Sequence, residues 1–166
     1  MSGEGDRYVR LMKELHRRES AKHFHVFLDY ASPSYSRQWF HTLRAQKCQS
    51  LLDGTLGKNR LMIFCPPQQG KSEVVSRKFP AWALGLRPTL KIVGSSYSAE
   101  LAQQFSRSIQ RTIDGEEYAE VFPNTYLNGK NVKADATRNW LRNADMFETV
   151  GYGGFYKAVG VCGSLT

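Results

Sequence analysis

One segment of the 166-residue sequence limits the possible folds more than any other. The apolar run Arg60-Leu-Met-Ile-Phe-Cys65 ends at Pro66-Pro67 and is followed by Gln68-Gln-Gly-Lys-Ser72. A short apolar run bounded by prolines predicts a buried strand, and the residues from Gly70 onward predict a helix. Phosphate-binding loops occur where a strand leads through such a turn into a helix. The segment therefore predicts an α/β fold that carries a phosphate loop.

The chemistry of this loop follows from three of its residues. Gly70, Lys71 and Ser72 match the pattern G-x-x-x-x-G-K-[ST], whereas Cys65 stands where the first glycine is usual. Gly70 allows backbone N–H groups to turn toward phosphate oxygens at the start of a helix. Lys71 supplies a positive charge for the β and γ phosphates, and the Ser72 hydroxyl is a ligand for Mg²⁺. We expect ATP and Mg²⁺ as cofactors. The alternative is an ordinary loop with a solvated Lys71 and a Ser72 that only begins the helix.

The rest of the chain alternates helices and strands. Periodic apolar residues predict helices over 8–31 and 36–52, the second with Trp39, Phe40, Leu43 and Leu51 directed inward. A helix from Gly70 is interrupted at Pro80 and ends at Gly85, a strand covers 90–94, and Ser98 caps a helix that ends at Gly115. Short β segments are predicted over 140–142, 146–150 and 155–161.

These elements predict one layered arrangement. Two strands that each lead into a helix predict parallel pairing, so we expect 60–65 to lie beside 90–94 in a mainly parallel sheet. The phosphate-binding interpretation depends on this pairing. Residues 1–57 are predicted to form a helical N-terminal region, and 58–166 the core domain with a small antiparallel β segment at its C-terminal end.

The composition limits the kinds of binding partner and of compartment that are expected for the chain. The net charge of +8 and the pI near 9.5 favour an anionic partner such as nucleic acid, although a basic solvated surface gives the same numbers. Three cysteines at long spacings form neither a disulfide framework nor a zinc pattern, so we expect a reducing compartment. The chain has no run of 18 apolar residues, and no membrane partner is expected.

The segment Pro66-Pro-Gln-Gln-Gly-Lys-Ser-Glu73 resembles the P-P-x-x-G-K-S-E loop of phage terminase large subunits, in which the first glycine is commonly missing. The resemblance spans roughly residues 27 to 166. It includes Gln38-Trp-Phe-His41, Phe79-Pro-Ala-Trp82, Ser95-Ser-Tyr-Ser98, Val121-Phe-Pro123 and Gly160-Val-Cys-Gly-Ser-Leu-Thr166. This chain has Gln68 where the family loop often has arginine.

The resemblance implies a P-loop NTPase of the ASCE type that moves double-stranded DNA into a procapsid and is followed by a nuclease domain. It implies a portal protein and a small terminase subunit as partners, a homo-oligomeric ring, and the host cytoplasm as the place of action. Implied nucleotide contacts are Pro67, Gln68, Gln69, Gly70, Lys71, Ser72 and Glu73, with Gln38 and His41 near the adenine. Lys71 is the implied catalytic residue, and Arg107 and Arg111 are candidates for neutralising transition-state charge.

A hydrolytic acid is not evident in the sequence. The family pattern places an apolar strand ending in two acids just after Thr166, and the carboxylates of the nuclease are also missing. We therefore expect a truncated ATPase portion that binds nucleotide with little turnover by itself. The alternatives are a non-hydrolysing nucleotide- or DNA-binding module and a generic P-loop helicase or transport ATPase.

Overall fold

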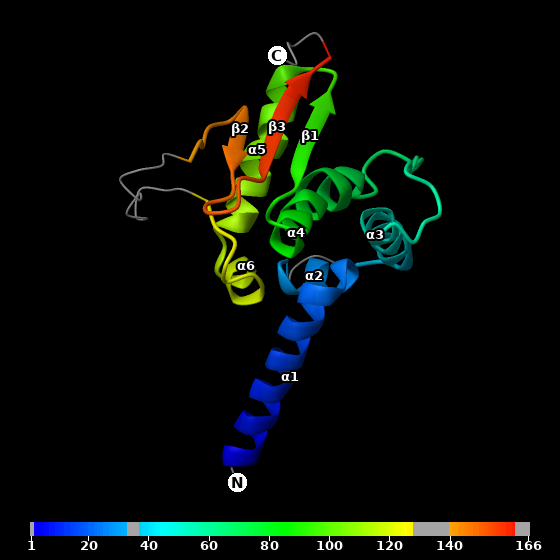
Figure 1. Ribbon diagram of the computed structural model, residues 1–166. Coiled ribbons are helices and arrows are strands. Elements are labelled where there is room, and N and C mark those ends of the chain that lie inside the picture. Colours follow the sequence, from blue (N-terminus) through cyan, green and yellow to red (C-terminus); the bar gives the residue numbers. More distant parts are fainter. Residues whose placement is uncertain (1, 33–36, 128–139, 162–166) are drawn as a thin grey trace.

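The computed structural model describes residues 2–32, 37–127 and 140–161, which form a set of helices and one small sheet (Figure 1). In chain order, the elements are α1 (Ser2–Lys22), α2 (Phe24–Tyr30), α3 (Trp39–Leu52), η1 (Ser72–Lys78), α4 (Phe79–Leu86), β1 (Lys91–Ser96), α5 (Ala99–Ile113), α6 (Glu116–Val121), β2 (Met146–Glu148) and β3 (Phe155–Gly160). None of the described helices is long and apolar enough to cross a membrane.

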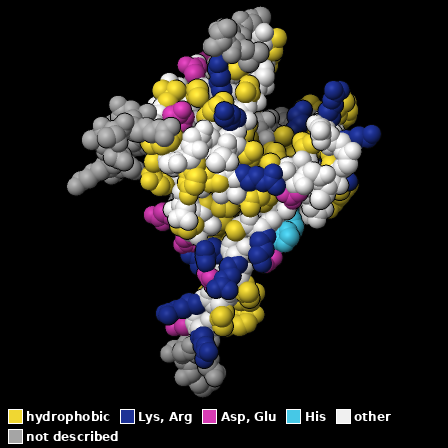
Figure 2. Space-filling model, viewed as in Figure 1, with side chains coloured by type: hydrophobic (Ala, Val, Ile, Leu, Met, Phe, Trp, Pro, Cys, Tyr) yellow, Lys and Arg dark blue, Asp and Glu magenta, His cyan; other side chains and the backbone are white. Residues whose placement is uncertain are grey.

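The N-terminal helical region is divided at His23 into α1 and α2. The first half of α1 projects from the body of the molecule (Figure 1), and Figure 2 shows apolar and basic side chains next to one another on it. Tyr8 and Leu11 are more than half exposed there. The second half of α1 is fastened to the core, because the indole N–H of the buried Trp82 donates to the Ser20 carbonyl at 3.0 Å.

The core lies where α2, α4 and α6 meet. It is rich in aromatic rings: the centroid of Phe24 lies 5.4 Å from that of Trp82, and Phe27 lies 6.1 Å from Tyr118. Each of these four side chains is at most 1% exposed. Aromatic pairs at such distances add to the free energy of apolar burial. This cluster holds α4 in place, and α4 continues η1, the helix that follows the loop.

The sheet has the order β1-β3-β2. β1 and β3 are parallel, in register from Lys91 opposite Phe155 to Ser96 opposite Gly160. β2 pairs antiparallel with β3, as expected for the C-terminal β segment, but the strand predicted over 140–142 is only an isolated bridge between Arg142 and Phe147. The helix expected after β1, which is α5, begins as predicted, since the Ser98 side chain accepts a hydrogen bond from the Leu101 N–H at 3.2 Å.

The prediction of a buried strand over 60–65 is wrong. Within the described residues this segment forms no strand, and the parallel neighbour of β1 is β3. Its side chains alternate instead: Leu61 and Ile63 pack against the core, whereas Met62 is 77% and Phe64 is 84% exposed. An apolar run predicts burial on both faces, but in the described part of the chain one face of this run is left exposed.

The prediction for the face of α3 is also wrong. Trp39 is 75% and Leu43 is 47% exposed, while the helix buries His41 and Arg44 together with two small side chains. The apolar spacing predicted that the aromatic side would face the core. The polar side faces inward because it meets the back of the loop.

Candidate phosphate-binding site

The predicted loop borders a pocket of about 490 Å³. It is lined by residues 65–73 together with Arg77, so that one continuous stretch of chain and the helix that follows it make the whole described wall. Lys71 and Ser72 are exposed at this pocket. The structure therefore brings together the loop residues that the sequence nominated.

The backbone of the loop is curved by two residues in the left-handed region. Gln68 has φ of 61° and Gly70 has φ of 65°. Alternation between right- and left-handed conformations turns successive N–H groups to one side and forms a concave anion site. Glycine adopts this region freely, but for Gln68 it costs about 1–2 kcal/mol. Strain of this kind collects at functional sites.

The helix after the loop begins in a wide π register. The Val74 N–H still donates to the Gly70 carbonyl, four residues back, at 3.1 Å, and the π register of residues 72–78 ends with the Phe79 N–H bonded to the Val74 carbonyl, five residues back. Pro80 follows and has no N–H with which to continue an ordinary α-helical pattern. The π register thus carries the chain from the loop into α4 without a break. π segments are frequent at functional sites.

Arg77 is a site residue that sequence reasoning missed. Its Nη1 donates to the Glu73 carboxylate at 3.0 Å, and its guanidinium lies 5.8 Å from the centroid of the Phe105 ring. The Nε atom is buried and has no hydrogen-bond partner among the residues that the structure describes. The sequence could have indicated this pair, because Glu73 and Arg77 are four residues apart and residues at that spacing lie on the same side of a helix.

The back of the loop rests on α3. The Gln69 carbonyl oxygen accepts a hydrogen bond from Arg44 Nη1 at 3.0 Å and lies 3.2 Å from His41 Nε2. The Gln38 N–H donates to His41 Nδ1 at 3.0 Å. Burial lowers the pKa of His41, because the imidazolium would lose its water, and the Arg44 charge lowers it further. Gln38 and His41 thus lie behind the loop, at its anchor on α3.

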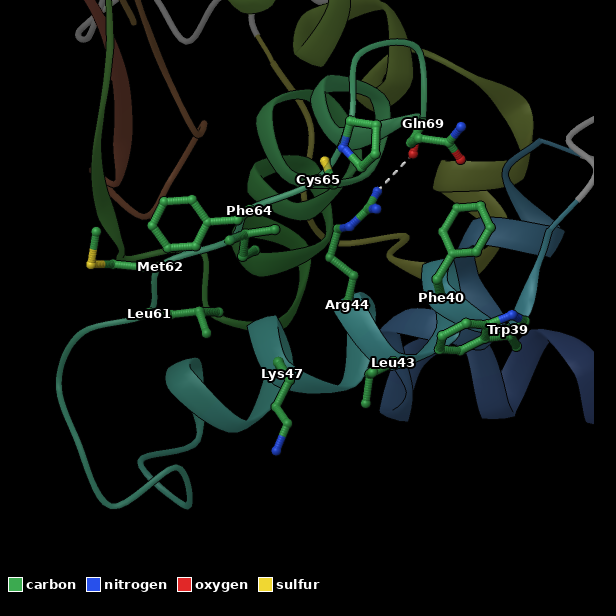
Figure 3. Close-up of a pocket in the computed structure, with 12 residues that line it drawn as sticks. Trp39, Phe40, Leu43, Arg44, Lys47, Leu61, Met62, Phe64, Cys65 and Gln69 are labelled. Atoms are coloured by element: carbon green, nitrogen blue, oxygen red, sulfur yellow. Dashed lines mark hydrogen bonds between the residues drawn. The ribbon is translucent and has the colours of Figure 1, made fainter.

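An apolar groove of about 470 Å³ lies on the α3 side of the loop. On one side it is lined by residues 61–66 and Gln69. On the other side it is lined by residues of α3 between Trp39 and Lys47, including the buried Arg44. Figure 3 shows Arg44 rising from α3 between the rings of Phe40 and Phe64, with its guanidinium directed at Gln69. Gln69 is therefore shared by the groove and the loop pocket.

The two arginines nominated on α5 lie elsewhere. Arg107 and Arg111 are exposed, and neither is among the residues that line the loop pocket. Arg111 lines a separate pocket with Lys78 and Thr112. The nominated stretch that ends at Thr166 lies outside the described residues beyond Val161.

The donors at the loop fit a magnesium triphosphate better than a bare metal ion. No group of three or more His, Cys, Asp or Glu in the described parts of the chain is arranged to hold a metal. The loop pocket offers a lysine, a hydroxyl and one arginine, which suit phosphate oxygens. Mg²⁺ usually keeps water and binds through few protein groups together with phosphates. Ser72 is the residue that would hold it here.

Comparison with known proteins adds no relative. No family model matches the chain, and neither a curated protein nor a solved structure matches it. The function is therefore inferred from the residues of the loop and their geometry.

Proposed function

We propose that the loop from Pro66 to Glu73 binds the phosphates of ATP with Mg²⁺, and that the chain is the ATPase portion of a viral DNA-packaging motor of the terminase large-subunit type. One observation carries the first part: left-handed conformations at Gln68 and Gly70 stand directly before Lys71 at a helix start. This combination makes an anion-binding concavity with a mobile positive charge at its rim.

The charges around the loop support the same assignment. Lys71 is exposed at the pocket, and Arg77 approaches it from the next turn of the helix. Arg77 gives a second cation at a loop that has Gln68 where related loops often have arginine. Arginine suits this role because its planar fork matches phosphate oxygens.

The strand pairing on which the expected phosphate loop depended is absent among the described residues, so only the local geometry of the loop supports the proposal. Residues 60–65 do not pair with β1, so the loop is supported from α3 and from the core behind α4 rather than by a neighbouring strand. The loop geometry is a local property of residues 68–72 and is present without that strand.

The motor function rests on the sequence resemblance and on charge. A net charge of +8 suits contact with the phosphate backbone of double-stranded DNA, which is largely independent of sequence. A portal protein, a small terminase subunit, neighbouring copies in a ring and the host cytoplasm are the remaining parts of this proposal.

The second candidate function is the binding of ATP without its hydrolysis. Among the residues that line the loop pocket, the single acid is Glu73, which is paired with Arg77. Hydrolysis by P-loop ATPases needs a carboxylate that holds Mg²⁺ and a group that orients the attacking water. We therefore expect the chain to bind ATP and to hydrolyse it at close to the background rate.

Calorimetric titration with ATP and Mg²⁺ tests the proposal. The parent protein should release heat with one site, and Lys71→Ala should weaken binding at least tenfold, because it removes a charge-assisted hydrogen bond to phosphate. Lys58→Ala is the matched control, since this exposed lysine lies upstream of the loop. Equal affinities of the parent and Lys71→Ala would remove the loop from consideration.

A further inference from the structure

The Gln69 carbonyl group connects the loop to α3. The Gln69 oxygen lies within hydrogen-bonding distance of Arg44 Nη1, at 3.0 Å, and of His41 Nε2, at 3.2 Å. A carbonyl oxygen has two lone pairs, so these two donors use its full capacity. The position of this oxygen is therefore set by α3 and not by solvent.

The tautomer of His41 is fixed by its other neighbour. Nδ1 accepts a hydrogen bond from the Gln38 N–H at 3.0 Å, so the ring proton belongs on Nε2. Nε2–H is then the donor to Gln69. His41 thus acts as a neutral donor whose orientation is held by the start of its own helix.

Arg44 is in an unusual place for a charged side chain. It is 7% exposed, and no ion pair joins it to an acid within the described residues. Its guanidinium also lies 5.7 Å from the centroid of the Phe40 ring. Burial of an unpaired charge is costly. The hydrogen bond from Arg44 to the Gln69 carbonyl compensates part of this cost.

Fixing the Gln69 oxygen also fixes the next N–H group. The chain has no cis peptide among its described residues, and in a trans peptide the C=O and N–H point in opposite directions. When the Gln69 oxygen faces α3, the Gly70 N–H faces away from α3. Gly70 is among the residues that line the loop pocket.

We infer that His41 and Arg44 are positioning residues of the phosphate loop: by holding the Gln69 carbonyl against α3, they keep the Gly70 N–H turned toward the pocket before any phosphate binds. This inference rests on the proposed phosphate function of the loop. Neither side chain touches the ligand, and both act through one peptide group. Preorganised donors bind more tightly because they are not reoriented on binding.

The test uses Arg44→Met, His41→Phe and the double variant, with sodium tripolyphosphate as the probe. Each single change should weaken binding about tenfold, and the double change should weaken it by less than the product, because the two donors act on the same carbonyl. Arg44→Lys keeps a donor and should recover part of the loss. Lys47→Met removes one exposed charge from the same helix and should leave the affinity unchanged.

A second readout is independent of any ligand. The Gly70 amide resonance in a ¹H–¹⁵N NMR spectrum of the ligand-free protein should shift in Arg44→Met and His41→Phe and stay in place in Lys47→Met. Unchanged Gly70 shifts in both single variants would overturn the inference, as would parent-level affinity in a folded double variant. If the parent protein does not bind tripolyphosphate, the proposed function fails, and the Gly70 shifts alone decide whether the anchor exists.

Discussion

Arg77 and Glu73 face one another at the side of the loop pocket, joined by a hydrogen bond of 3.0 Å between Nη1 and the carboxylate. Among the described residues, Glu73 is the only acid that lines this pocket, and Arg77 Nε has no hydrogen-bond partner. An incoming phosphate offers this guanidinium a more strongly charged acceptor than Glu73.

Arg77 is therefore expected to contribute to phosphate binding. Arg77→Met should weaken the binding of ATP with Mg²⁺ about tenfold, since it removes a charged donor from the pocket. Glu73→Gln should strengthen it, because a competing carboxylate is neutralised. Calorimetry measures both. Arg87→Met is the control, since this arginine contacts the end of α3, and a tenfold loss there would mean that the effect is not specific to the pocket.

Cys65 gives a chemical probe of the loop. It is partly exposed and lines the pocket, whereas Cys48 is 2% exposed and burial raises its pKa to about 11. In a Cys162→Ser background at neutral pH, iodoacetamide should modify Cys65 far faster than Cys48, because the thiolate is the nucleophile. Saturating ATP with Mg²⁺ should slow the reaction of Cys65 several-fold, as mass spectrometry would show. Identical rates with and without ATP would place the nucleotide elsewhere.

Gly94 tests the packing of the sheet. The ring of Tyr156, on the neighbouring strand, occupies the space where a side chain at Gly94 would lie. Gly94→Ala should therefore lower the free energy of unfolding by about 1–3 kcal/mol through overpacking. Gly5→Ala is the matched control, because it lies in α1 with open space around it and should be neutral or stabilising by up to about 1 kcal/mol. Urea unfolding compares the two, and equal effects would contradict the β1–β3 packing.

As the pH is lowered, the folded protein should lose stability at pH values higher than those at which its carboxylates become protonated. Burial lowers the pKa of His41 and of His25 below the ordinary 6.5, with Arg44 and Arg37 acting in the same direction. The unfolded chain then binds more protons than the folded one, so stability is complete above pH 6.5 and is lost as the pH falls below it. Urea unfolding at pH 7.5 and 5.5 should show this loss, and His41→Gln should reduce it. A variant with the parent's full pH dependence would show that His41 is not involved.

Much of the local structure follows from the sequence. The Ser98 cap, the helix behind it and the antiparallel β segment near the C-terminal end have local signals, and the structure contains all three. The failure at 60–65 has a different cause. Residues 60–65 have the composition of a buried strand. Whether a segment pairs in a sheet depends on the strands around it, and composition does not show that β1 pairs with β3 instead.

The loop was predictable because its signal is local, whereas its supports were not. Gly70, Lys71 and Ser72 are adjacent in sequence, and Gly70 has the positive φ that a tight turn before a helix needs. His41 and Arg44 lie 28 and 25 residues before Gln69, on a helix whose apolar spacing favoured the opposite face. The buried face of α3 also holds Ala45 and Cys48, and the contact of His41 and Arg44 with a distant backbone oxygen leaves no mark in residue spacing.

The order of strands in the sheet also bears on how the protein is made. β3 lies between β1 and β2, yet of the three it is the last to leave the ribosome. Until it emerges, β1 lacks its partner strand and β2 has only its local contacts with residues 141–143, while the helices up to α6 are already complete. Closing the long span from Lys91 to Phe155 is then the slow, entropically costly event of folding. Nascent chains halted before β3 should expose strand edges that associate with other chains.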